Sequence, residues 1–164
     1  MRLAFAEASI SLFLSGYQFP DLTPPHPAGE WDADWLVVIG KIHSNGRTGE
    51  FRDPCLTAFE AGELGRWLRV ISQSGRGDDR RSVTSLDFTE PELAFECALL
   101  SDDDAVIRVV FSGGAAHPED GVGGAGEEAR VVTVQMSLAD IGLAADEWER
   151  ECARYPARST DAAP

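Results

Sequence analysis

VTSLDFTEPELAFECALLSDDDAVIRVVFS, residues 83–112, contains three apolar runs that are separated by two polar turn sequences. The runs cover residues 83–89, 93–100 and 105–112, and SDDD at 101–104 separates the last two. Short runs rich in β-branched and aromatic residues, bounded by Pro, Ser and Asp, are typical of consecutive β-strands joined by tight turns. The stretch therefore predicts an antiparallel meander.

The first turn of this meander carries two carboxylates, Glu90 and Glu92, on either side of Pro91. Proline supplies the fixed backbone angle that a tight turn needs, which explains its presence here. A carboxylate pair can also act as general acid and base, but it then needs a desolvated pocket that raises a pKa, and the sequence indicates none. We expect both side chains to project, exposed, from an end of the sheet.

Before the meander, the sequence predicts a strand, a loop and a hairpin. Residues 1–19 read as one strand, because polar residues interrupt the apolar run and exclude a signal peptide. Four prolines in residues 20–27 indicate a loop. The apolar stretch WLVVIGKIH at 35–43, followed by SNG at 44–46, indicates a hairpin.

Two helices begin at recognisable capping sequences. Thr57 with Glu60, and Ser137 with Asp140, have capping-box spacing, and apolar residues recur at helical intervals after each pair. A last strand is expected at 131–136, and the glycine-rich residues 113–128 read as a mobile loop. The fold class is therefore α+β, an antiparallel sheet, mostly a meander, with two helices packed on one face. Residues 1–156 form a single domain in this interpretation, and 157–164 are a disordered tail.

The charge of the chain is strongly negative and unevenly distributed. The chain has 14 basic and 28 acidic residues, a formal net charge of -14. Residues 83–164 contain 17 of the acidic residues and only 5 of the basic ones. Such a field repels nucleic acid and anionic membranes and favours a basic protein partner, although acidity also serves solubility.

No pattern typical of a catalytic or metal site stands out. The three cysteines, Cys55, Cys97 and Cys152, form no metal-binding or redox spacing and read as buried apolar residues in a reduced, cytoplasmic protein. The three histidines lack ligand spacing, and SDDD lacks the continuation of a calcium loop. The sequence predicts no cofactor, no metal and no enzymatic activity.

An ordered series of short motifs resembles the WapI-type immunity proteins of bacterial polymorphic-toxin systems. The motifs are GYQFP (16–20), DADWLVV (32–38), FRDPCLT (51–57), LGRWL (64–68), FTEPELAFE (88–96) and AADEWERECARYP (144–156). The resemblance implies a small cytoplasmic protein that binds and neutralises a cognate nuclease toxin domain that attacks tRNA. Residues 113–128 depart from the family, since they carry glycine and acid in place of an aromatic- and proline-containing segment.

We expect acidic residues at strand ends and turns to contact the partner, together with one aromatic anchor; these are Glu90, Glu92, Asp102, Asp103, Asp104 and Trp31. Trp35 is a second possible anchor but fits the core better. An alternative function is that of an accessory interaction domain with a non-toxin protein partner, because such a domain would have the same acidic composition and the same lack of catalytic motifs. A hydrolase is the third alternative, and it requires desolvated carboxylates that cluster in one deep pocket.

Overall fold

The strands form two antiparallel meanders, one in each half of the chain. The computed structural model describes residues 1–22, 31–74, 84–99, 101–116 and 129–158. The first sheet has the order β1-β2-β3-β4 and the second the order β5-β6-β7-β8, so every strand pairs with its neighbour in sequence. The strands are β1 (Arg2–Phe5), β2 (Ala8–Tyr17), β3 (Trp35–Ser44), β4 (Arg47–Thr57), β5 (Thr84–Asp87), β6 (Leu93–Leu99), β7 (Asp104–Phe111) and β8 (Arg130–Ser137). The α+β class and the meander are confirmed, and the strands divide between two sheets where one was expected.

The N-terminal segment differs from the expected single strand. It folds into the hairpin β1–β2 through Ala6 and Glu7, and Ala6 adopts a positive φ of 48°. Alanine gives no turn signal in a sequence, because non-glycine residues seldom take this conformation. The hairpin between β3 and β4 does follow its sequence signal, with Asn45 and Gly46 at positive φ.

Both long helices begin at the residues that the capping patterns predict. In α1 (Ala58–Gln73) the Thr57 hydroxyl accepts from the Glu60 amide, and the Glu60 carboxylate accepts from the Thr57 amide, a complete capping box. In α3 (Leu138–Cys152) the Ser137 hydroxyl accepts from the Asp140 amide. The helix α3 ends before Pro156, with Ala153 as its C-cap.

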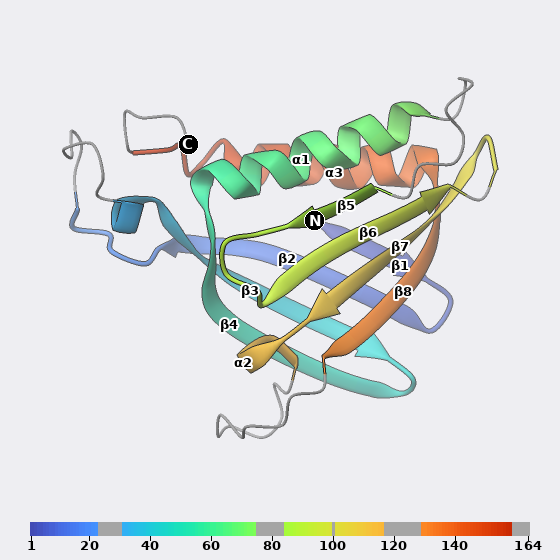
Figure 1. Cartoon of the computed structure of the whole chain (residues 1–164), viewed down its shortest axis with the longest axis horizontal. Helices are drawn as coiled ribbons and strands as arrows, with labels where there is room; N and C mark the ends of the chain where they lie inside the picture. Colours follow the sequence, from blue (N-terminus) through green and yellow to red (C-terminus); the bar gives the residue numbers. More distant parts are fainter. Residues whose placement is uncertain (23–30, 75–83, 100, 117–128, 159–164) are drawn as a thin grey trace.

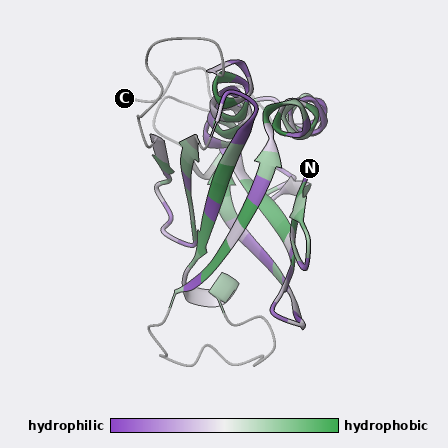
Figure 2. Ribbon diagram, turned by 90° about the vertical axis from the view of Figure 1, so that its right-hand side faces the viewer, coloured by the Kyte–Doolittle hydropathy of each residue, from purple (hydrophilic) through white to green (hydrophobic). Residues whose placement is uncertain are grey.

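The two long helices lie side by side on the same side of the sheets (Figure 1). They run antiparallel, and Trp148 of α3 is fully buried and donates its indole N–H to the Ala61 carbonyl of α1 at 2.7 Å. The short helices are η1 (Trp31–Asp34) and α2 (Gly113–Ala116), and α2 lies at the end of the sheets opposite the long helices (Figure 2). The loop expected at 113–128 thus begins with α2, and residues 117–128 lie outside the described part of the chain.

A single hydrophobic cluster joins the two sheets and the helices. It combines inward-facing strand residues such as Leu12, Val38, Phe95 and Ile107 with apolar side chains of both long helices. Gly40 belongs to this interior, because the Phe51 ring occupies the space where a Cβ would stand, 1.9 Å away. Packing in this core therefore determines which strand ends of the two sheets lie next to each other. The candidate site lies between such strand ends.

Candidate functional site

A pocket of about 360 Å³ opens where the two sheets come together. Its walls come from the end of β2, the start of β3, the middle of β4 and the turn between β5 and β6. The described residues that line it are Gln18, Phe19, Trp35, Asp53, Pro54, Glu90 and Glu92. Three carboxylates and two aromatic rings therefore share one cavity, and no lysine or arginine is among these residues.

Two irregularities in the first sheet lie next to the segments of β2, β3 and β4 that line the pocket. The pairing of β2 with β3 shifts between Leu14 and Gly16, where Gly16 has a positive φ of 146°. The pairing of β3 with β4 shifts between Leu36 and Val38, opposite the segment that contains Pro54. Shifts of this kind bend a strand and change the direction of its side chains, and proline is tolerated there because β4 is an edge strand.

Glu60 holds the turn that contributes the other two carboxylates. Its side chain is buried and accepts hydrogen bonds from the amides of Thr57 (2.8 Å) and Thr89 (2.7 Å). Burial by itself would raise the pKa of Glu60, but these hydrogen bonds outweigh it and hold the pKa below its ordinary value. The first turn of α1 is thereby tied to the turn that carries Glu90 and Glu92.

The environment of the pocket disfavours negative charge on two of its carboxylates. Burial raises the pKa of Asp53, and burial together with the nearby charges of Asp53 and Glu90 raises the pKa of Glu92. The Oε2 atom of Glu92 is inaccessible to solvent and has no hydrogen-bond partner within the described chain. The expectation of an exposed, unperturbed Glu92 is therefore wrong, because the sheet ends enclose the turn. A positive charge placed in this pocket would be stabilised.

The structure separates the acidic residues that the sequence suggested as one contact surface. Glu90 and Glu92 precede β6, whereas Asp102, Asp103 and Asp104 follow it, so the two groups lie roughly 20 Å apart at opposite ends of the sheet. The aspartates form a polar turn in which the Ser101 hydroxyl accepts from the amides of Asp103 (3.2 Å) and Asp104 (3.0 Å).

The positions of the aromatic residues also differ from those expected from the sequence. Trp35, which the sequence favoured as a core residue, is only partly buried and lines the pocket. The backbone of Trp31 belongs to η1, and its side chain lies outside the described part of the structure. Phe19 and Asp53 were not singled out by sequence reasoning; the motifs GYQFP and FRDPCLT contain them but give no sign that they meet.

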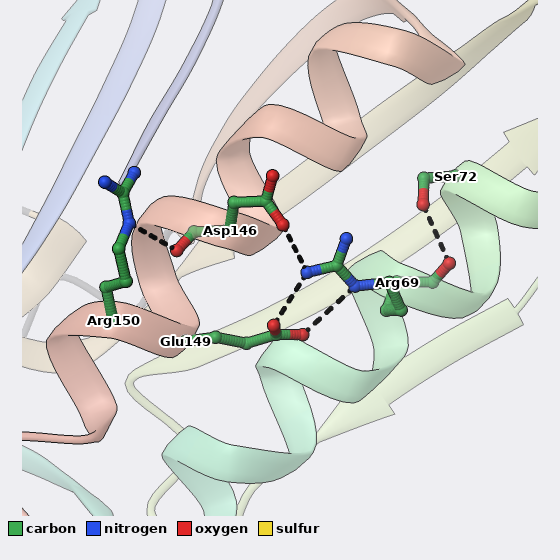
Figure 3. A network of polar contacts seen from close by, with 5 residues as sticks. All are labelled: Arg69, Ser72, Asp146, Glu149 and Arg150. Atoms are coloured by element: carbon green, nitrogen blue, oxygen red, sulfur yellow. Dashed lines mark hydrogen bonds and ion pairs between the residues drawn. The ribbon is translucent and has the colours of Figure 1, made fainter.

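Other acidic residues of the C-terminal half are already paired with arginines. Figure 3 shows Arg69 of α1 between Asp146 and Glu149 of α3, with donor–acceptor distances of 2.7 and 3.2 Å to Glu149. On the second sheet, Arg108 pairs with Glu96. These acids help to hold the protein together, so part of the negative charge beyond residue 82 serves internal contacts.

In the part of the chain that the structure describes, neither the cysteines nor the other acidic residues form a second site. Cys55 and Cys97 are buried, as expected, and burial raises the pKa of Cys97 and Cys152 to about 11, so these thiols stay protonated. Within the described residues no group of His, Cys, Asp and Glu side chains is arranged to hold a metal ion. None of the described helices has the length and hydrophobicity of a membrane span.

Comparisons with known proteins identify a family. Two solved structures have low similarity to this chain. The plant transcriptional regulator PBF-2 is 8% identical with a TM-score of 0.48, and the match covers 94% of this chain and 80% of that one. WHY3 from Arabidopsis thaliana is 7% identical with a TM-score of 0.47, and the match covers 94% of this chain and 86% of that one. Similarity at this level says nothing about function. No curated protein matches the chain. The model of the Immunity protein WapI-like family matches residues 4–156, in agreement with the motif series. The chain therefore belongs to the WapI-like family of immunity proteins, whose role is immunity against a toxin.

Proposed function

We propose that this protein binds and neutralises a basic nuclease toxin domain of the tRNA-cleaving kind, and that the acidic pocket is the centre of the contact. The observation that carries the proposal is the gathering of Asp53, Glu90 and Glu92 with Phe19 and Trp35 around one cavity. Immunity proteins generally act by binding without catalysis, so a site of this kind has a role in recognition.

A cationic side chain of the toxin fits the chemistry of this pocket. A lysine or arginine is attracted by carboxylates, and the face of an aromatic ring adds a cation–π contribution of about 0.5–2 kcal/mol. Arginine fits best, because its planar guanidinium can stack on a ring and donate to a carboxylate at the same time. The raised pKa values of Asp53 and Glu92 would fall on binding, since a nearby positive charge favours the ionised form.

The nature of the partner follows from the same electrostatics. A nuclease domain that holds tRNA must present positive charge to the phosphate backbone. An acidic inhibitor approaches that surface quickly and competes with the substrate for it. The inhibitor acts where tRNA is found, in the cytoplasm.

The test of the proposal is co-expression of this protein with toxin domains of the tRNA-cleaving kind, beginning with any that is encoded next to its gene. We expect restored growth, intact tRNA and a stable complex whose affinity falls with increasing salt. Two double variants with the same change of charge locate the contact. Glu90→Gln with Glu92→Gln should weaken the complex tenfold or more, and Asp102→Asn with Asp103→Asn should change it by less than about threefold. Equal effects would contradict a contact centred on the pocket.

A hydrolase remains the second candidate, because carboxylates with raised pKa values in one cavity are what acid–base hydrolysis needs. All three carboxylates keep partial exposure, which is less desolvation than that alternative requires. Hydrolysis of glycoside or ester substrates by the purified protein, abolished in Glu92→Gln, would favour this candidate over an immunity role.

A further inference from the structure

The chain segment after α3 reaches the rim of the acidic pocket. Tyr155 packs edge-on against Tyr17, with ring centroids 5.7 Å apart, and the Tyr17 hydroxyl donates to the Pro156 carbonyl. The guanidinium of Arg158 lies over the Tyr17 ring, 3.4 Å from its centroid. Residues 155–158, the C-terminal strap, are therefore held against the end of β2. This includes the described part of the segment expected to be a disordered tail.

Arg158 contacts the two chain segments that supply the aromatic residues of the pocket. Its guanidinium donates to the carbonyls of Phe19 (2.9 Å) and Leu22 (2.8 Å), and its own amide donates to the buried carboxylate of Asp34. Phe19 lines the pocket itself, and Asp34 immediately precedes Trp35, which lines it too. One residue thus links the Phe19 side of the pocket to the Trp35 side.

Hydrogen bonds fix the backbone around Phe19, whereas its side chain is exposed to solvent. The Phe19 carbonyl also accepts from the Leu22 amide at 3.3 Å, and the neighbouring Gln18 amide donates to the Trp35 carbonyl at 2.8 Å. Phe19 as a whole residue nevertheless remains 41% exposed. A rigidly presented aromatic ring beside a pocket is the usual form of an interface anchor, because little entropy is lost when it is covered.

We propose that Arg158 is a positioning residue for partner binding, which holds Phe19 and the Phe19–Leu22 turn in the conformation that the partner recognises. The inference rests on the proposed function for the identity of the partner, but not for the arrangement of the rim. Arg158 acts through backbone carbonyls, because its Nη1 group donates to both Phe19 and Leu22. Lysine is a poor substitute, since its compact ammonium cannot stack on the Tyr17 ring as the planar guanidinium does.

The first experiment needs no partner and measures amide hydrogen exchange by NMR. In Arg158→Ala, exchange at Gln18 and Leu22 should be about tenfold faster, which is the effect of losing one charge-assisted hydrogen bond on local opening. Arg150→Ala is the matched control, since Arg150 has the same charge but contacts the Asp146 carbonyl within α3. Unchanged exchange at Gln18 and Leu22 in Arg158→Ala would overturn the inference.

The second experiment measures affinity for the co-expressed toxin domain in a double-mutant cycle. We expect Arg158→Ala and Phe19→Ala each to weaken binding about tenfold, Arg158→Lys to restore little, and the double variant to bind like Phe19→Ala alone. Full additivity would mean that Arg158 acts independently of Phe19, and would overturn the positioning role. If the wild-type chain does not bind the toxin domain, the proposed function fails, and the exchange experiment still decides whether Arg158 holds the rim.

Discussion

Replacing Glu92 with glutamine should make the protein more stable and a weaker inhibitor. The Oε2 atom of Glu92 is inaccessible to solvent and accepts no hydrogen bond from the residues that the structure describes, and the pKa of Glu92 is raised by burial and by the charges of Asp53 and Glu90. Glutamine removes the negative charge that burial and the neighbouring carboxylates disfavour, and because Glu92 is partly exposed and solvent screens its charge, the expected gain is only about 1 kcal/mol. For a chain of this size that corresponds to a rise in Tm of about 2–4 °C.

The pH dependence of this gain has a definite sign. A carboxyl whose folded-state pKa is raised binds its proton more tightly in the folded protein, so wild-type stability falls as pH rises through that pKa. Glutamine has no proton to lose, so its advantage should be present at pH 7 and smaller at pH 4, and it should vanish only below about pH 3.5, where the glutamate is mostly protonated in both states.

Urea denaturation followed by circular dichroism at pH 4 and pH 7 measures the difference. Glu7→Gln is the control, since Glu7 lies exposed in the β1–β2 turn and the variant changes the net charge by the same amount. Binding of the toxin domain should weaken in Glu92→Gln and not in Glu7→Gln, a gain in stability at the expense of function. A lower urea midpoint for Glu92→Gln at pH 7, or a gain that is equal at both pH values, would refute the reasoning.

Three further predictions concern the framework that holds the site. Gly40→Ala places a Cβ 1.9 Å from the Phe51 ring and should destabilise the fold by about 1–3 kcal/mol or more, and Phe51→Leu in the same chain should recover part of the loss in urea denaturation. Trp148→Phe removes the bond to the Ala61 carbonyl and should lower stability by about 1–3 kcal/mol, with unchanged stability as the contrary result. Thr57→Ala removes the N-cap of α1 and should lower the free energy of unfolding, measured by calorimetry, by about 1–2 kcal/mol. A loss below about 0.5 kcal/mol would contradict the role of Thr57 as a buried N-cap.

Much of the local structure could be predicted from the residues themselves. The starts of α1 and α3, the β3–β4 hairpin and the strands of the meander follow from Thr57, Ser137, the Asn45–Gly46 pair and the apolar runs. Capping and turn formation involve atoms only a few residues apart, so a short window of sequence contains the interaction. The Ala6 turn escaped this reasoning because its conformation is imposed by the pairing of β1 with β2 and not by its residue type.

The residues alone were enough to predict the α+β class, the capped helices, the acidic charge and the resemblance to a family of immunity proteins. Tertiary structure alone decided that Phe19, Trp35, Asp53, Glu90 and Glu92 meet in one pocket, that Asp102 lies at the far end of β6, and that Arg158 reaches the rim. The physical reason is that strand and helix formation depend on neighbours in the chain. The meeting of strand ends depends on how the apolar faces of two whole sheets pack, and many arrangements share the same alternating pattern.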